Sequence, residues 1–305
     1  LPIEDGPLVL ASPGKGLLQE TWGRVEALAC DIVFPVLHGT FGEDGIIQGL
    51  LEAAGLPYVG AAVLGSALGM DKEKAKIIWK AQGIPVLPWI CARKRDLEPG
   101  RLEALVARVG EELAWPAFVK PVSAGSSVGA AKAEGPGSLA AALAAALEWD
   151  ERALIEPFCA AREIECSVLG NTGGATRAFA PGEVVPSHEF YDYEAKYIDP
   201  DGARLDIPAR IPSEVSSLVM DLAIKAYEAL EITGLARVDF FLAKEGEGLW
   251  LNEVNTLPGF TSISMYPKMC DAGGLPYPEL LSRLIDLGYE RHAARQGLKF
   301  SYQGA

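Results

Sequence analysis

Two short hydrophobic runs in the last third of the chain are separated by a polar turn and predict a β-hairpin. The first run covers residues 238–242, the second covers 249–254, and the sequence EGEG between them is typical of a turn. A hairpin would bring Asp239 on the first strand beside Glu253 on the second. Because side chains alternate along a strand, Glu253 and Asn255 would point to the same face.

Similar patterns predict strands and helices through much of the chain. Residues 31–37 have the pattern of a buried strand, the loop HGTFGEDG follows, and residues 46–55 have helical spacing. Such a loop lies where open α/β sheets bind ligands, so His38, Glu43 and Asp44 are candidate site residues. Capping of the helix is a slightly better explanation for the two acids. Strands are also predicted at 84–89, 117–121, 153–157, 162–171 and 234–241, and helices at 71–82, 138–148 and 211–230.

The hairpin carries candidate metal ligands. Asp239, Glu253 and Asn255 would supply two carboxylates and an amide oxygen, and Mg²⁺ prefers a few hard oxygen ligands together with substrate phosphates. For Asp239 alone, an acidic hairpin exposed to solvent is the better explanation. The second strand, however, leads into TLPGFTS, where Pro258 and Gly259 predict a turn with backbone N–H groups near the acids. Hairpin and loop together favour a site for metal and phosphate.

Two lysines are candidates for binding phosphate. Lys72 lies in the first turn of a predicted helix, where a cation opposes the helix dipole unless it faces an anion. Lys120 lies on a short apolar strand, where its charge needs a partner. The GSSVG loop that follows offers hydroxyls and backbone N–H groups, but it has neither P-loop nor dinucleotide-binding spacing. Exposure to solvent is the default for the other lysines of the helix, which are Lys74, Lys76 and Lys80.

Carboxylates on two later strands are candidates for binding a nucleoside. The strand at 153–157 carries Glu156, and the next strand carries Glu163 and Glu165. A carboxylate beside an apolar wall suits an adenine amino group or ribose hydroxyls. A solvated strand edge explains Glu165 equally well.

A loop and an arginine complete the candidate chemistry. The segment 188–202, HEFYDYEAKYIDPDG, has three tyrosines and Lys196, which favours a loop that closes over a substrate rather than an ordinary surface loop. Arg237 alternates to the same face as Asp239. Its guanidinium either stabilises an anion or forms a salt bridge to Asp239.

Composition narrows the class of protein. The length of 305 residues suits about two or three closely packed domains. A net charge of −14 argues against a general binder of nucleic acid or of anionic membranes and favours small-molecule partners. Five scattered cysteines without a CxxC indicate neither a zinc site nor a disulfide framework. No apolar run reaches transmembrane length and no signal-peptide pattern is present, so we expect a cytoplasmic protein.

A series of motifs occurs in the order found in a known family. They are HGTFGEDG, MDK, FVKP, GSSVG, LIEPF, EFYDYEAKY, GLARVDFF and NEVNTLPGFTS. Through them the chain resembles the D-alanine–D-alanine ligases of the ATP-grasp superfamily, from about residue 31 to near the C-terminus. The resemblance implies an α/β (α+β) ATP-grasp fold with a Rossmann-like N-terminal domain at 1–60, a central domain at 61–155 and a catalytic C-terminal domain at 156–305. It also implies a homodimeric enzyme that joins two D-alanines through an acyl phosphate, using ATP, for the bacterial cell wall.

The resemblance also implies roles for individual residues. Lys72 and Lys120 would hold ATP phosphates, and Lys196 would bind the γ-phosphate when its loop closes. The full set implied to bind ATP is Lys72, Lys120, Ser127, Glu156, Phe158, Glu163 and Lys196, with Glu156 and Glu163 at the adenine and ribose. The ligands for two Mg²⁺ ions, with Mn²⁺ as an alternative, would be Asp239, Glu253 and Asn255. The catalytic set would be Arg237, Ser126, Tyr197 and the backbone N–H of Gly259, and the pocket for the second D-alanine would be His38, Ser264 and Met265.

Two features of the sequence, compared with the family pattern, indicate whether the chain is truncated and which second substrate it takes. The family's first strand and its loop with the pattern GG-x-S-x-E-H-x-V-S do not occur in this sequence, which predicts a truncated chain. The motif EAKY, ending in Tyr197, resembles the dipeptide-forming ligases rather than the lactate-forming relatives. Three functions stay open at this point: ligation of two D-alanines, ligation of D-alanine to D-serine or D-lactate, and nucleotide binding without catalysis.

Overall fold

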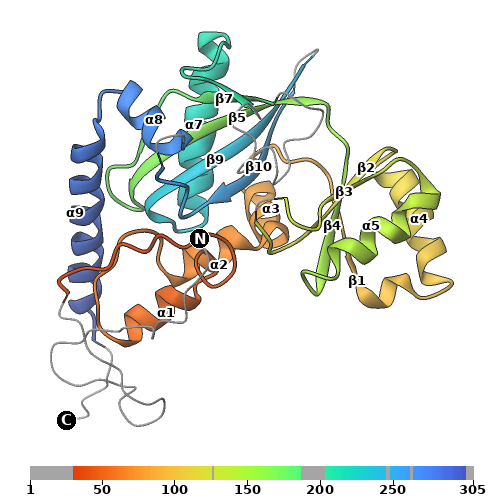
Figure 1. Cartoon of the computed structure of the whole chain (residues 1–305), viewed down its shortest axis with the longest axis horizontal. Helices are drawn as coiled ribbons and strands as arrows, with labels where there is room; N and C mark the ends of the chain where they lie inside the picture. Colours follow the sequence, from red (N-terminus) through yellow and green to blue (C-terminus); the bar gives the residue numbers. More distant parts are fainter. Residues whose placement is uncertain (1–29, 126, 187–202, 245–247, 262–263, 300–305) are drawn as a thin grey trace.

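The computed structural model describes residues 30–125, 127–186, 203–244, 248–261 and 264–299. The predictions for Ser126, Lys196 and Tyr197 therefore lie outside the described residues. The described residues form two β-sheets flanked by helices, with the smaller sheet on the right in Figure 1. The helices are α1 (Ile46–Ala53), α2 (Val63–Met70), α3 (Lys72–Ala81), α4 (Arg101–Glu112), α5 (Leu139–Ala146), α7 (Ser213–Ala229), α8 (Met265–Ala272) and α9 (Tyr277–Gln296), with short 3₁₀ turns at Lys94–Leu97 and Pro136–Ser138.

The smaller sheet has the strand order β1-β4-β2-β3, and all neighbouring strands are antiparallel. Helices α4 and α5 cover it, and buried side chains such as Val109 and Leu143 share one core with Ile155 of the sheet. Lys120 and Glu156 therefore lie on the two central strands. The strands are β1 (Ile90–Arg93), β2 (Ala117–Pro121), β3 (Ala131–Ala133) and β4 (Arg152–Pro157).

The larger sheet has the strand order β10-β9-β5-β7-β8, and β6 pairs with β5 at its side. Strands β5 and β9 pair in register along all 11 residues of each. The strands are β5 (Ala161–Asn171), β6 (Arg177–Ala178), β7 (Gly182–Pro186), β8 (Ala203–Asp206), β9 (Thr233–Ala243) and β10 (Leu249–Asn255).

The two faces of the larger sheet pack against different helices. Cys166 and Val238 lie in a core shared with α3 and α7, which includes Tyr227. On the opposite face, Ser167 donates a hydrogen bond of 3.1 Å to the backbone carbonyl of Tyr266 in α8. Side chains alternate along a strand, so the polar residues that alternate with Cys166 and Val238 lie on the α8 side of the sheet.

Two of the strands predicted from the sequence are wrong. Residues 31–37 form only an isolated parallel bridge between Val33 and Tyr58, and Val36 is 63% exposed rather than buried. Residues 84–89 likewise form a single bridge, from Val86 to Leu251. Each segment contains proline, which has no backbone N–H to donate to a strand ladder, so regular pairing stops at one bridge.

The helix predicted at 71–82 is confirmed as α3. Asp71 caps it, because its side chain accepts a hydrogen bond of 3.0 Å from the backbone N–H of Lys74. The chain turns after the helix at Gly83, whose φ of +72° favours glycine. This cap fixes the start of the helix at Lys72 and so decides where that lysine points.

None of the helices in the described part of the chain is both long and apolar enough to cross a membrane.

Candidate active site

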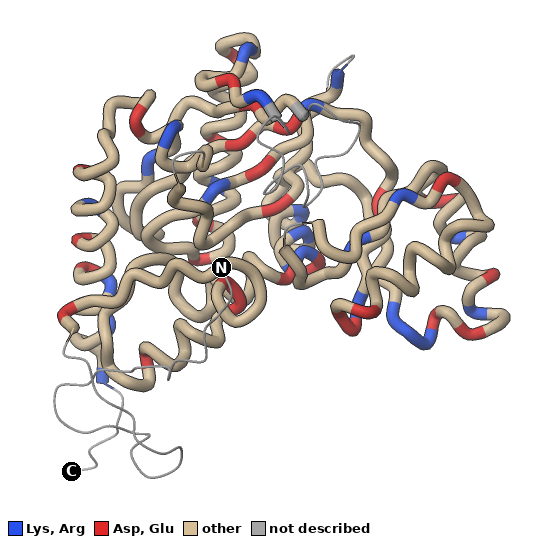
Figure 2. The backbone as a smooth tube through the Cα atoms, in the orientation of Figure 1, with Lys and Arg blue, Asp and Glu red and all other residues tan. Residues whose placement is uncertain are grey.

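Acidic side chains form a row across three strands of the larger sheet. In the strand register Glu165 of β5 lies opposite Asp239 of β9, which lies opposite Glu253 of β10. Figure 2 shows acidic and basic segments together across the middle of this sheet. The predicted hairpin and the pairing of Asp239 with Glu253 are confirmed. The solvated strand edge that explained Glu165 is wrong, because Glu165 is 8% exposed and on a central strand.

Arg237 neutralises much of this row. Its guanidinium binds Asp239 through two hydrogen bonds, of 2.8 Å from Nε and 2.7 Å from Nη2, and its Nε lies 3.0 Å from Glu165 Oε2. Burial tends to lower the pKa of Arg237, but Asp239 and Glu165 outweigh it and hold the pKa well above its usual value. The salt bridge to Asp239, one of the two sequence interpretations, is therefore present. The role at an oxyanion stays a prediction.

The residues predicted as metal ligands are adjacent to one another. The Asn255 amide donates a hydrogen bond of 2.8 Å to Asp239 Oδ2, and Asp239 faces Glu253 across the hairpin. Within the described ranges, no group of three or more His, Cys, Asp or Glu side chains is arranged to hold a metal ion. Two carboxylates and an amide oxygen, completed by phosphate oxygens, nevertheless match the few hard ligands that Mg²⁺ takes from protein. The donor set therefore fits Mg²⁺.

Lys72 reaches this carboxylate row from the start of α3. Its Nζ donates a hydrogen bond of 2.8 Å to the Ala124 carbonyl and lies 3.4 Å from Glu253 Oε2, and the residue is 8% exposed. The sequence predicted that a lysine in this first helical turn faces an anion. In this structure that anion is Glu253.

Lys120 approaches strand β10, which carries Glu253, from the smaller sheet. Its Nζ lies 2.8 Å from Glu156 Oε2 and donates a hydrogen bond of 3.0 Å to Asn252 Oδ1, next to Glu253. The other oxygen of Glu156 forms an ion pair with Lys76. The expectation that Lys76 is solvated is wrong, because its side chain is completely buried, whereas Lys74 and Lys80 are exposed as expected.

Three further residues implied to bind ATP lie near the smaller sheet or on β5. Phe158 directly follows β4, and the Lys132 ammonium lies 4.4 Å from the centre of its ring. Ser127 has a left-handed backbone conformation, with φ of +57°, in the loop after β2. Glu163 is half-buried on β5, opposite Phe241 of β9. Glu156 itself is 2% exposed with both oxygens on lysines, so its implied contact with adenine or ribose requires that these pairs rearrange.

Two side chains from the loop after residue 37 hold the backbone of Leu257. The His38 ring bonds the Leu257 carbonyl through Nδ1 at 2.9 Å, and Glu43 accepts a hydrogen bond of 3.0 Å from the Leu257 amide. Burial raises the pKa of Glu43, although its backbone hydrogen bonds oppose the rise. The N-cap of α1 is Gly45, and Asp44, one residue before it, accepts a hydrogen bond of 3.0 Å from the Ile46 amide at the start of the helix. For Glu43 the capping interpretation is wrong.

The loop held in this way leads to the remaining candidates. Ser264 accepts a hydrogen bond of 3.0 Å from the Thr261 amide, and a side chain added at Gly259 would meet Ser264 Oγ at 2.6 Å. Gly259 and Ser264 are therefore close neighbours in this loop. Met265 begins α8 and is 5% exposed in the core on that side of the sheet.

Sequence reasoning missed three contributors to this site. They are the buried Lys76, the amide of Asn252 that binds Lys120, and Glu165 as a partner of Arg237. A signal for Lys76 existed, because it lies four residues after Lys72 and thus on the same face of the helix. Asn252 belongs to the NEVN motif, but nothing in the local pattern indicates that it binds a lysine of another sheet.

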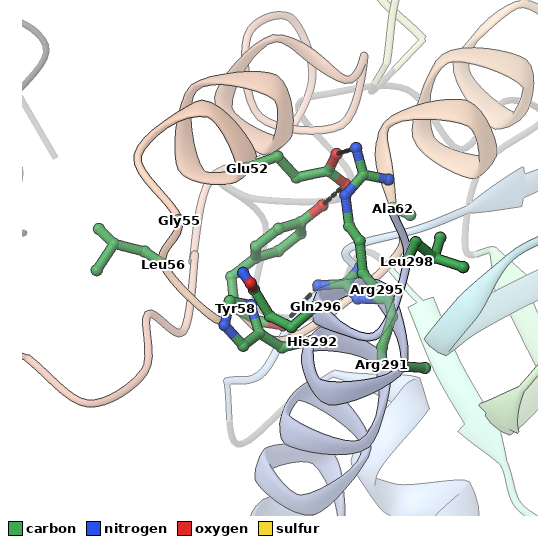
Figure 3. Close-up of a pocket in the computed structure, with 11 residues that line it drawn as sticks. Glu52, Gly55, Leu56, Tyr58, Ala62, Arg291, His292, Arg295, Gln296 and Leu298 are labelled. Carbon is green, nitrogen blue, oxygen red and sulfur yellow. Dashed lines mark hydrogen bonds and ion pairs between the residues drawn. The ribbon is translucent and has the colours of Figure 1, made fainter. Parts of the chain in front are cut away.

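A separate cavity of about 620 Å³ lies between the end of α9 and the loop after α1 (Figure 3). No residue that lines it belongs to the candidate active site. Its polar side chains bond to one another: Tyr58 donates to Glu52 at 2.9 Å, Arg295 pairs with Glu52 at 2.8 Å, and Arg291 lies over the Tyr58 ring. The geometry indicates that these groups fasten α9 to the rest of the molecule.

Family models match most of the chain. One, described as the D-ala D-ala ligase C-terminus, matches residues 78–286, and another, the D-ala D-ala ligase N-terminus, matches residues 12–61. The chain belongs to the D-alanine–D-alanine ligase family. As a family member it is a ligase with an ATP-grasp fold, in agreement with the resemblance seen in the sequence.

Individual ligases of the family are similar over most of their length. The D-alanine–D-alanine ligase of Treponema denticola is 48% identical over 297 residues, which is 97% of this chain and 80% of the relative. A solved D-alanine–D-alanine ligase from Coxiella burnetii has a TM-score of 0.76 and 41% identity, covering 88% of this chain and 70% of that one. The VanG D-Ala:D-Ser ligase of Enterococcus faecalis has the same TM-score and 38% identity, covering 87% and 74%.

Proposed function

We propose that this ligase joins two D-alanines to D-alanyl-D-alanine with ATP, for peptidoglycan precursor synthesis. The observation that carries the proposal is the convergence of Lys72 and Lys120 on β10 beside the row that contains Asp239 and Glu253. Phosphoryl transfer depends mostly on positioning and on neutralising the charge of phosphate oxygens. Cations and oxygen ligands brought together from separate elements suit that task.

In this proposal the nucleotide lies against the two lysines. Lys72 and Lys120 bind the phosphates, and Ser127 and Lys196 complete the phosphate contacts. Glu156, Phe158 and Glu163 are proposed at the adenine and ribose. Asp239, Glu253 and Asn255 would hold two Mg²⁺ ions, with Mn²⁺ as the alternative, and bound metal would neutralise charge on the phosphate oxygens.

The reaction then proceeds in two steps. A carboxylate oxygen of the first D-alanine attacks the γ-phosphorus and ADP leaves, which forms an acyl phosphate. The amine of the second D-alanine attacks the acyl carbon, loses a proton, and phosphate leaves.

Donors around the acyl carbon support the second step. Arg237 uses Nε and Nη2 on its carboxylate partners, and its Nη1 carries two further donors that suit a developing oxyanion together with the N–H of Gly259. Ser126 and Tyr197 are proposed to orient the substrates. The pocket for the second D-alanine is proposed to contain His38, Ser264 and Met265.

A second candidate differs only in the second substrate. The likeness to the VanG D-Ala:D-Ser ligase, at 38% identity and a TM-score of 0.76, supports D-serine as an alternative acceptor. We also propose domain boundaries near residues 60 and 155 and a homodimer. A cytoplasmic location is proposed because the substrates are small and diffusible.

Phosphate release by the full chain with Mg²⁺ and ATP tests the proposal. Release with D-alanine alone, and detection of the dipeptide, is the expected result, with L-alanine inactive as a control. Faster release when D-serine or D-lactate is added, with a mixed product, would favour the second candidate. ATP binding without release under any pairing would contradict both and leave a nucleotide-binding protein without catalysis.

A further inference from the structure

A buried charge cluster lies beside the proposed phosphate site. Lys76 of α3 is fully buried, and its Nζ forms an ion pair with Glu156 Oε1 and donates a hydrogen bond of 3.2 Å to the Leu87 carbonyl. The other oxygen of Glu156 lies 2.8 Å from Lys120 Nζ. One buried carboxylate is therefore shared by two ammonium groups.

Stability alone does not explain this arrangement. Two cations share one anion, so the cluster carries a surplus positive charge in a buried position. Replacing a buried ion pair by apolar residues of similar volume is often neutral or stabilising, and an unbalanced charge adds a further desolvation cost. Burial, together with the charge of Lys120, lowers the pKa of Lys76. A bound polyphosphate would balance the surplus charge.

The cluster also orients Lys120. An ammonium group has three N–H donors. Glu156 Oε2 and Asn252 Oδ1 use two of them, at 2.8 Å and 3.0 Å. With two donors directed into the protein by fixed acceptors, the direction of the third is set as well, and within the described ranges that third donor is left for a ligand.

We propose that Lys76 is a positioning residue for nucleotide binding. It does not touch ATP: it binds one oxygen of Glu156 so that the other oxygen orients Lys120 toward the phosphates. The inference rests on the proposed function, because it takes Lys120 as a phosphate ligand.

The substitution Lys76→Met tests this. It removes the charge and keeps an unbranched side chain, and it leaves Lys120 and Glu156 as a balanced pair, so we expect the variant to fold. Lys80→Met is the matched control, because Lys80 lies one turn further along α3 and over the same ring of Trp89 but is exposed. We expect the dissociation constant and the KM for ATP to rise about tenfold in Lys76→Met, the loss of roughly one charged hydrogen bond. The KM for D-alanine should match the control.

A double-mutant cycle separates positioning from a general structural effect. If Lys76 acts through Lys120, then adding Lys76→Met to Lys120→Met weakens ATP binding no further. Unchanged ATP affinity in Lys76→Met would overturn the inference. So would a loss of ATP affinity on adding Lys76→Met to Lys120→Met that equals the loss caused by Lys76→Met alone. Should Lys76→Met not fold, Lys76→Gln, which keeps a donor for the Leu87 carbonyl, takes its place in the same cycle. ATP binding is measured without D-alanine, so a parent protein that binds ATP but forms no dipeptide contradicts the proposed function and leaves this test intact.

Discussion

The carboxylate of Glu43 accepts a hydrogen bond of 3.0 Å from the backbone amide of Leu257, 214 positions further along the chain. The same carboxylate accepts a hydrogen bond of 2.7 Å from the Gly39 amide, and the Leu257 carbonyl is bonded by His38. Both backbone groups of Leu257 are thus held by the loop after residue 37. Because Gly259 lies two residues further on, this contact controls where its proposed oxyanion donor is placed.

Glu43→Gln should lower kcat for dipeptide formation by about tenfold or more. Glutamine has a single carbonyl oxygen, so one of the two amides loses its partner, at a cost of about 1–3 kcal/mol in the free energy of unfolding. Phosphate release and urea unfolding measure the two effects. Asp44→Asn is the control, because in the described part of the chain the Asp44 carboxylate bonds the nearby Phe41 and Ile46 amides and not Leu257, so the change should affect stability alone. A kcat within about twofold of the parent in Glu43→Gln would show that the anchor is not needed for catalysis.

Glu253→Gln should abolish turnover and leave the fold intact. The change removes one charge from the proposed metal ligands and replaces it with a group of the same size. Phosphate release with D-alanine and thermal unfolding are the measurements, with Glu228→Gln on the exposed face of α7 as the control. Activity near that of the control would exclude Glu253 as a metal ligand.

Gly259→Ala should raise the KM for D-alanine and lower kcat, with little change in ATP binding. The added Cβ would lie 2.6 Å from Ser264 Oγ, so Ser264 must move and give up its hydrogen bonds of 3.0 Å and 2.9 Å to Thr261. Gly49→Ala provides the control, because a Cβ there meets no atom within 4 Å and alanine suits a helix. Equal kinetics for the two variants would contradict a substrate role for this loop.

The stability of the parent protein should depend on Glu156 at acid pH. Burial acts to raise the pKa of Glu156, but Lys120 and Lys76 outweigh it and lower the pKa below the ordinary value of 4.5. A carboxylate with a lowered pKa in the folded state contributes stability above the unfolded value, and that contribution is lost as the pH falls from 4.5 through the folded pKa.

Glu156→Gln tests this dependence. At pH 7 the free energy of unfolding of the variant should be about 3–5 kcal/mol lower than that of the parent, because two buried lysines lose their partner. Below pH 4.5 its free energy of unfolding should fall less steeply than that of the parent, since glutamine does not titrate. Urea unfolding from pH 7 down to the acid transition measures both, and Glu148→Gln corrects for the loss of one exposed carboxylate. If the free energies of unfolding of Glu156→Gln and of the parent fell in parallel with pH, the lowered pKa of Glu156 in the folded state would be refuted.

Local patterns were enough to predict several elements of the site. Alternation and a turn sequence predicted the hairpin that brings Asp239 beside Glu253, and a capping residue predicted where the helix of Lys72 begins. The motif order predicted the family and its fold. These features depend on neighbours in sequence, or on the periods of strand and helix, and both can be seen in a single chain.

Contacts between distant elements were decided only by the tertiary structure. The sequence by itself determined the elements, the family and the residue types of the site. It could not show that Lys76 is buried on Glu156, that Glu165 shares Arg237 with Asp239, or that proline limits two expected strands to single bridges. Charge and size are properties of a residue, but burial and pairing depend on which element packs against it, and only the folded chain brings those elements together.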